Sequence, residues 1–167
     1  MFSTIKIKIY SASIKNPRNF KNITLLLDGH DSTIDYSKPN ISAQKRWSYK
    51  LKTSGLRIQV LADINNMIIN VSNSELCGVS SDGGMFLNMK IYNRIDIRDV
   101  VAVDGGYTLF IEQFEELCNK NDKKLNDNKF FCPIRKEPDQ ELNVQEKHFN
   151  DVFGSFRSTI NHRKPIL

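Results

Sequence analysis

The sequence predicts a mixed α/β domain, in which a central mixed sheet contains an antiparallel three-strand meander and carries helices on its faces. Two observations support this prediction. In the first half of the chain, short apolar runs end at Gly, Asn or Asp, which indicates strands joined by turns. In the second half, strand-like runs alternate with segments of helical periodicity. The chain has 167 residues and 40% hydrophobic composition, which suffices for one domain with a proper core.

The first half of the chain reads as a series of extended segments. Residues 1–21 form an N-terminal extension in which isoleucine and lysine alternate, as in an edge strand, although a loosely held tail fits equally well. Extended segments of the meander are expected at residues 23–27, 46–52, 56–62 and 67–71. Asp63 is most simply a hairpin residue after the third of these segments.

The second half of the chain alternates helices with strands. Ser80 and Ser81 precede a helix expected over residues 82–90. The other expected elements are a buried strand at 100–103, a helix at 108–118, a short strand at 130–134 and a final helix at 144–160. We therefore expect the domain to span residues 22–160, followed by a tail at 161–167.

Composition excludes several classes of protein. The three cysteines are widely and irregularly spaced, so neither a disulfide framework nor a zinc site is indicated, and a reducing intracellular setting is expected. No apolar stretch reaches the roughly 18–20 residues that cross a bilayer. The net charge of +5 suits a polyanionic partner without identifying one.

Two aspartates stand where an apolar run meets glycine. Asp28 follows residues 25–27 and precedes Gly29, and Asp104 follows residues 100–103 and precedes Gly105. Each carboxylate is therefore expected at the tip of a strand. Hard cations such as Mg²⁺ prefer oxygen ligands and are often held by one or two carboxylates, so the two acids are candidate metal ligands. The alternative is that each is only a turn or cap residue.

The order of the elements indicates whether these aspartates meet. Antiparallel strands followed by helix, strand, helix, strand and helix fit an RNase H-like fold. In that fold the first strand and the strand after the first helix lie side by side, which would bring Asp28 and Asp104 together.

Four segments of the chain have the order and spacing of a known family. They are residues 27–34, 45–63, 80–83 and 103–107, which are similar to the segments D-G-T-H-I, K-x-x-Y-S-x-N-x-Q-x-x-x-D, H-D-S and G-D-S-G-Y. In this respect the chain resembles the catalytic domain of PIF/Harbinger-type transposases, a branch of the DDE superfamily endonucleases, over about residues 23–158. The resemblance places Asp28 and Asp104 at the first two catalytic acids.

The third acidic position departs from the family pattern. The family's last helix carries R-x-x-x-E-x-x-F-G-x-x-K, and Phe153, Gly154 and Arg157 fit it. Asn150 stands where the catalytic glutamate is expected, and Glu146 stands where the arginine is expected. Because residues four apart share a helix face, Glu146 is a candidate substitute for the missing acid.

The resemblance implies a divalent-metal-dependent DNA endonuclease or strand-transfer domain of transposon origin. Mg²⁺ or Mn²⁺ would be held by Asp28 and Asp104, with Glu146 or Asn150 completing the site. DNA would be the partner, with an oligomer or a separate DNA-binding protein as a further partner, and the location would be nuclear. Basic side chains expected to line a phosphate-backbone groove are Lys45, Arg46, Lys50, Arg57 and Arg157, against the alternative of ordinary solvated faces.

Two alternatives to an active transposase domain stay open. In the first, the domain is a catalytically inactive, domesticated or relic one that only interacts with nucleic acid. The asparagine at position 150 favours this reading, and so does an apparent truncation, since no helix-turn-helix precedes the segment and the chain stops soon after the last helix. In the second, the domain is an RNase H-like nuclease that acts on another nucleic acid.

Overall fold

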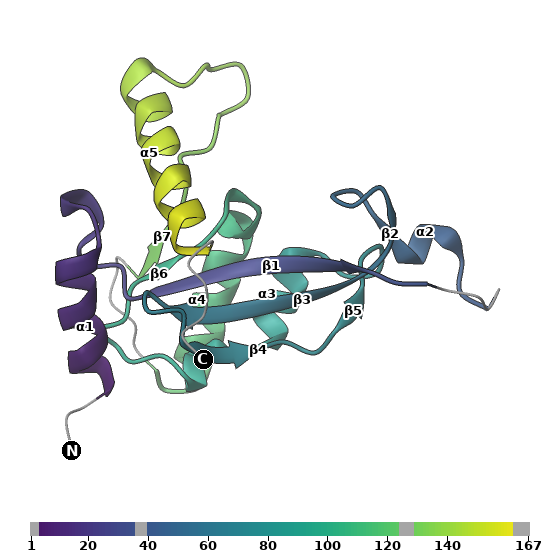
Figure 1. The fold of residues 1–167 in the computed structure, drawn as a ribbon, viewed down its shortest axis with the longest axis horizontal. Coiled ribbons are helices and arrows are strands. Elements are labelled where there is room, and N and C mark those ends of the chain that lie inside the picture. Colours follow the sequence, from purple (N-terminus) through teal and green to yellow (C-terminus); the bar gives the residue numbers. More distant parts are fainter. Residues whose placement is uncertain (1–3, 36–39, 124–128, 162–167) are drawn as a thin grey trace.

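A seven-stranded mixed sheet lies at the centre of the molecule, with helices packed on both of its faces (Figure 1). The computed structural model describes residues 4–35, 40–123 and 129–161, the side chain of Asn161 excepted. Residues 162–167 of the predicted C-terminal tail lie outside the described part. None of the described helices is long and apolar enough to cross a membrane.

The elements follow one another along the chain as a long first strand, a meander and then alternating helices and strands. The strands are β1 (Leu25–Thr33), β2 (Trp47–Ser48), β3 (Thr53–Asp63), β4 (Ile68–Val71), β5 (Glu75–Leu76), β6 (Val101–Ala102) and β7 (Phe130–Phe131). The α-helices are α1 (Thr4–Lys15), α2 (Ala43–Arg46), α3 (Asp82–Asn88), α4 (Ile111–Lys120) and α5 (Val144–Asn161). Short 3₁₀ helices are η1 (Arg18–Phe20), η2 (Ile91–Asn93) and η3 (Gly105–Phe110).

The strand order confirms a mixed sheet. Its main path is β2-β3-β1-β6-β7, and β4 and β5 also pair with β3. β1 pairs antiparallel with β3 over nine residues, whereas β1 with β6 and β6 with β7 are parallel. β1, β3 and β4 therefore form the predicted antiparallel meander, and β6 after α3 lies beside β1 as expected.

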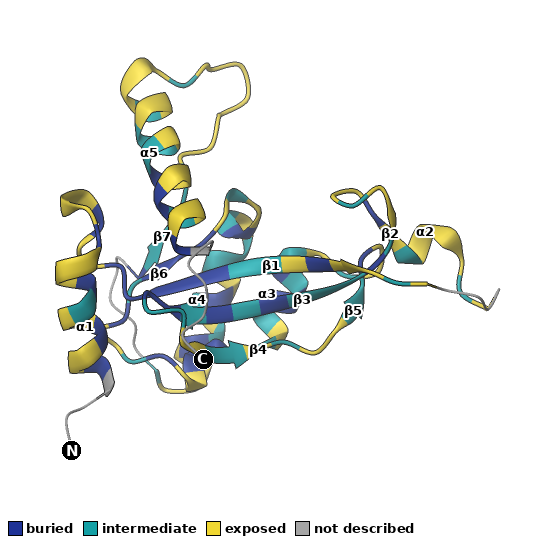
Figure 2. Ribbon diagram, in the orientation of Figure 1, coloured by how far each residue is buried: buried dark blue, intermediate teal, exposed yellow. Residues whose placement is uncertain are grey.

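The sheet separates two hydrophobic cores. Leu25 and Leu27 of β1 belong to a core that includes Phe86 of α3 and Phe114 of α4. Leu26 belongs to a second core that includes aromatic side chains of η1 and α5. This alternation is the period of two expected of a strand covered on both faces. Figure 2 shows buried residues in the core parts of β1 and β3 and exposed residues on the outer faces of α1 and α5 and along α2.

The predicted edge strand or loose tail over residues 1–21 is wrong for Thr4–Lys15, which form α1. Ile5, Lys8, Ala12 and Asn16 are buried, and their spacing of three or four residues is that of a helix face. Lys8 is on that face because its ammonium group pairs with the buried carboxylate of Asp99. The alternation of isoleucine and lysine therefore did not indicate which side chains of this segment are buried.

The first strand is longer than predicted. β1 continues to Thr33 because its ladder with β3 runs from Leu25 opposite Asp63 to Thr33 opposite Gly55. Asp28 is therefore inside β1 and not at its tip. On the other edge of β1, however, the described pairing with β6 ends at Leu26 opposite Ala102. Asp28 thus lies just beyond the carboxyl end of the parallel pairing.

The extended segment predicted at residues 46–52 is also shorter in the structure. Only Trp47 and Ser48 form a strand, and they follow the single-turn helix α2. The chain then turns at Ser48, whose carbonyl accepts a hydrogen bond from the Lys52 amide and whose hydroxyl accepts one from the Leu51 amide. In contrast, the helices predicted at 82–90, 108–118 and 144–160 are confirmed by α3, by η3 with α4, and by α5.

Candidate functional site

Asp28 of β1 and Asp104, which follows β6, lie at matching positions beyond the parallel pairing of these two strands. In the parallel ladder Leu25 is opposite Val101 and Leu26 is opposite Ala102, and each aspartate follows two residues after the last pair. Adjacent strands are separated by about 4.8 Å, so this register places the two residues next to each other. By strand alternation Asp28 projects to the same face as Leu26, which is the face covered by α5.

Arg157 of α5 contacts both aspartates. Its Nη2 lies 3.4 Å from Oδ1 of Asp28, and its Nη1 lies 3.3 Å from Oδ1 of Asp104. The arginine side chain is 13% exposed, while the two carboxylates are 44% and 61% exposed. One guanidinium group therefore bridges two carboxylates that stay open to solvent. Backbone amides add to this arrangement, because Gly29 donates to Asp28 and Gly105 donates to Asp104.

The two candidates for the third position have other partners. Glu146 and Asn143 cap the start of α5 for each other, since each side chain accepts a hydrogen bond from the other's backbone amide. The Asn150 amide group accepts from the backbone N–H of Ile134 and donates to its carbonyl, at 2.8 and 2.9 Å. A glutamate at position 150 has no N–H with which to make the second bond. Asn150 therefore fixes the segment after β7 to α5.

A third carboxylate approaches the pair from the opposite face of the sheet. Asp82, the first residue of α3, makes an ion pair of 3.0 Å with Nη1 of Arg57. Its backbone carbonyl accepts a hydrogen bond from the buried side chain of Gln59. In the sequence, residues 80–83 were interpreted as a helix start and as the segment similar to H-D-S, and Asp82 was not predicted to be a site residue. An acid directly after the helix cap, following the meander, is the signal that could have identified Asp82.

Tyr107 of η3 completes the surroundings of these acids. The side chain is buried, and its hydroxyl lies 3.6 Å from where a Cβ of Gly29 would be. Burial, and after it the negative charges of Asp82, Asp28 and Asp104, raise the pKa of Tyr107 well above its usual range. The phenol is therefore a neutral hydrogen-bond donor at any ordinary pH, placed beside three carboxylates.

The chemistry of these residues fits a hard divalent cation. Asp28 in β1 and Asp104 just after β6 offer oxygen ligands only, and Mg²⁺ is commonly held by one or two carboxylates together with substrate phosphates. Within the described residues, no three Asp, Glu, His or Cys side chains are grouped closely enough to hold a metal ion. The candidate cation site therefore rests on the pair Asp28 and Asp104. The positive charge of Arg157 lies between them.

The predicted nucleic-acid residues fall into two groups. Lys45 and Lys50 are exposed, near the exposed aromatic side chains of Trp47 and Tyr49. Arg46 instead donates to the Ile41 carbonyl and the Ser54 hydroxyl, and Arg57 binds Asp31 with two hydrogen bonds.

We expect Arg57→Met to destabilise the protein most at neutral pH. Arg57, and to a smaller extent the hydroxyl of Ser48, hold the pKa of the buried Asp31 carboxyl well below its usual range, against the effect of burial. Removing one partner of a buried ion pair costs about 3–5 kcal/mol. The pair stabilises above the unfolded-state pKa of about 3.9, and this stabilisation is lost as the pH falls below that value. The difference in unfolding free energy between the wild type and Arg57→Met, measured with urea, should therefore become smaller as the pH is lowered from 7 to 3.

Arg98→Met is the matched control for this measurement. Arg98 pairs with Asp96 at the surface, with side chains 49% and 34% exposed, so its loss is expected to change stability far less than the loss of Arg57. A deficit of Arg57→Met that stayed constant from pH 7 to pH 3 would contradict the assignment to Asp31.

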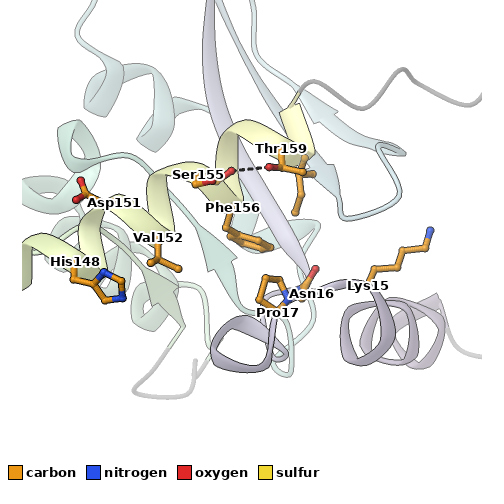
Figure 3. A pocket seen from close by; sticks show the side chains of 10 residues that line it. Lys15, Asn16, Pro17, His148, Asp151, Val152, Ser155, Phe156 and Thr159 are labelled. Carbon is orange, nitrogen blue, oxygen red and sulfur yellow. Dashed lines mark hydrogen bonds between the residues drawn. The ribbon is translucent and has the colours of Figure 1, made fainter. Parts of the chain in front are cut away.

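A hollow of about 680 Å³ lies between the end of α1 and α5, away from the aspartates (Figure 3). Asn16, His148, Ser155 and Thr159 are among the residues that line it. Ser155 and Thr159 lie about 200° around the helix from Arg157, so the hollow and the aspartate pair use opposite sides of α5. It is therefore no part of the candidate site.

Comparison with protein families identifies the family of this chain. Residues 27–164, which are more than half of the chain, match the family model described as DDE superfamily endonuclease. The matched span includes Asp28, Asp82, Asp104 and Arg157. Neither a curated protein nor a solved structure gives a significant match.

Proposed function

The chain belongs to the DDE superfamily of endonucleases, and from this membership we propose that it cleaves phosphodiester bonds of DNA at Asp28 and Asp104. The observation that carries the proposal is the placement of Asp28 and Asp104 at matching positions beyond the β1 and β6 pairing, with Arg157 bridging them. Two solvent-accessible carboxylates beside a partly buried guanidinium group form a site for a cation and for a phosphate.

The superfamily is generally dependent on divalent metal ions, and Asp28 and Asp104 would hold the ion here. When bound, Mg²⁺ or Mn²⁺ supplies a Lewis acid that polarises the phosphate and lowers the pKa of an attacking water. Asp28 in β1 and Asp104 just after β6 would bind and orient the ion, from a part of the sheet that is packed on both faces. With the charge of the aspartates balanced by the ion, Arg157 would donate its N–H groups to a phosphate oxygen.

Finer features of the proposal rest on the resemblance described above. We assign the fold to the RNase H-like class, which the position of β6 beside β1 supports. The order of the quoted segments supports a PIF/Harbinger type and a role in strand transfer. A nuclear location and a separate DNA-binding partner or oligomer follow from that type alone. Lys45 and Lys50, exposed beside Trp47 and Tyr49, are the side chains best placed to contact the DNA backbone.

We expect the protein to nick supercoiled plasmid DNA in the presence of Mg²⁺ or Mn²⁺ and to lose this activity in EDTA. Conversion of supercoiled into open-circular DNA on agarose gels measures the reaction. Glu146→Ala is expected to keep the activity, because the Glu146 carboxylate caps α5. Asn150→Ala is expected to lower thermal stability more than the rate per folded molecule, because Asn150 holds the backbone of Ile134.

Two results would contradict this expectation in different ways. DNA binding without any metal-dependent nicking would favour the inactive, relic domain. Loss of nicking in a folded Glu146→Ala variant would identify Glu146 as the third acid of the site.

A further inference from the structure

The carboxylate of Asp82 lies close to the backbone that carries the two aspartates. Its Oδ1 is 3.4 Å from where a Cβ of Gly29 would be, and its Oδ2 is 3.9 Å from where a Cβ of Gly106 would be. Gly29 follows Asp28 directly, and Gly106 lies two residues after Asp104. Because neither glycine has a side chain, the carboxylate of Asp82 can lie close to the backbone next to the two aspartates.

Two buried polar atoms near Gly29 have no hydrogen-bond partner among the described residues. They are the hydroxyl of Tyr107 and Oε1 of Gln59, on side chains that are 2% and 0% exposed. The Tyr107 hydroxyl lies 3.6 Å from the Cβ position of Gly29, and Gln59 is the cross-strand partner of Gly29. Since buried polar groups are almost always hydrogen-bonded, both atoms can bind a further polar group at this position.

The side chain of Asp82 is able to move while its backbone is fixed. Gln59 holds the carbonyl of Asp82, and Ser81 caps the helix that begins with it. The carboxylate itself is 41% exposed and pairs with Arg57. Arg57 keeps two hydrogen bonds to Asp31 if Asp82 leaves, so the departure uncovers no buried charge. A change of χ1 well moves the carboxylate by several ångströms.

We propose that Asp82 is the third carboxylate of the cation site formed with Asp28 and Asp104, and that the Tyr107 hydroxyl positions it by a hydrogen bond. This inference rests on the proposed function and goes beyond it, because the third acid is then supplied by α3. The α5 positions Glu146 and Asn150 have structural roles instead. Asp82 rotates away from Arg57 to join the other two acids.

Binding of Mn²⁺ alone to the 167-residue chain tests the proposal without reference to activity. Isothermal titration calorimetry on the wild type, Asp28→Asn and Asp82→Asn measures the affinity. Asp82→Asn is expected to weaken Mn²⁺ binding at least about tenfold, since even an indirect partner of a metal ligand is commonly worth that much. Asparagine keeps an acceptor for Arg57, so thermal unfolding without Mn²⁺ should be unchanged. Tyr107→Phe should give a smaller loss in the same direction.

Asp122→Asn is the matched control, because Asp122 is exposed after the end of α4. It should bind Mn²⁺ as the wild type does. Wild-type affinity in Asp82→Asn, together with loss of binding and nicking in Asp28→Asn, would overturn the inference and leave the proposed function intact. A wild type that neither binds Mn²⁺ nor nicks DNA would overturn both.

Discussion

Asp28→Asn and Asp104→Asn are each expected to abolish metal-dependent nicking, with a rate loss on the order of a thousandfold. A bound metal ion supplies several kcal/mol of transition-state stabilisation, and about 1.4 kcal/mol corresponds to a tenfold change in rate. Both side chains are exposed enough that asparagine leaves the fold unchanged. Initial rates of plasmid nicking in Mg²⁺, measured on variants with unaltered thermal unfolding, check the expectation.

The double variant Asp28→Asn/Asp104→Asn sharpens this test. If both carboxylates hold the same ion, removing the second should reduce the rate little further, because residues that act as a unit are not additive. Asp122→Asn should nick at the wild-type rate. A single variant that keeps a rate within a few-fold of the wild type would remove its aspartate from the site.

Phe20→Ala is expected to destabilise the protein by about 3–5 kcal/mol, the range for truncating a buried phenylalanine. Phe20 of η1 is 2% exposed and forms ring contacts with Phe131, Phe149, Phe153 and Phe156, at centroid distances of 5.8, 6.3, 5.6 and 4.8 Å. Three of these partners belong to α5, which carries Arg157. Thermal unfolding should show a decrease in Tm of roughly 10 °C for a chain of this length.

Tyr49→Ala is the control for Phe20→Ala. Tyr49 is 76% exposed, so its truncation should change stability by no more than about 0.5 kcal/mol. An equal effect of the two substitutions would mean that Phe20 does not anchor α5. Nicking by Phe20→Ala should also fall at temperatures below its Tm if the anchor positions Arg157 over the aspartates.

The parts of the fold that were predictable have strong local signals. The apolar run at residues 100–103 and the helical spacing of Phe149, Phe153 and Phe156 predicted β6 and α5 because burial there follows the local pattern. The first helix was not predictable in this way. Its buried Lys8 is explained by Asp99, 91 residues further along the chain, and no local pattern contains that partner.

The candidate site was predictable only in part for a similar reason. The glycines after Asp28 and Asp104 drew attention to these acids, and the parallel register places them together. Asp82 was missed because its approach depends on the empty side-chain positions of Gly29 and Gly106, which are distant in sequence. The family pattern directed attention to Asn150, whose hydrogen bonds to Ile134 are a product of tertiary structure.

The ion pairs of Arg157 with the two aspartates make folding of the protein independent of metal binding. Two neighbouring carboxylates without a counter-charge would repel each other and favour the unfolded chain until an ion arrived, as happens in small domains that fold only around a metal. Here the protein brings its own positive charge from α5. The chain can therefore fold and stay folded when divalent ions are scarce. A chelator should abolish its catalytic activity without unfolding it.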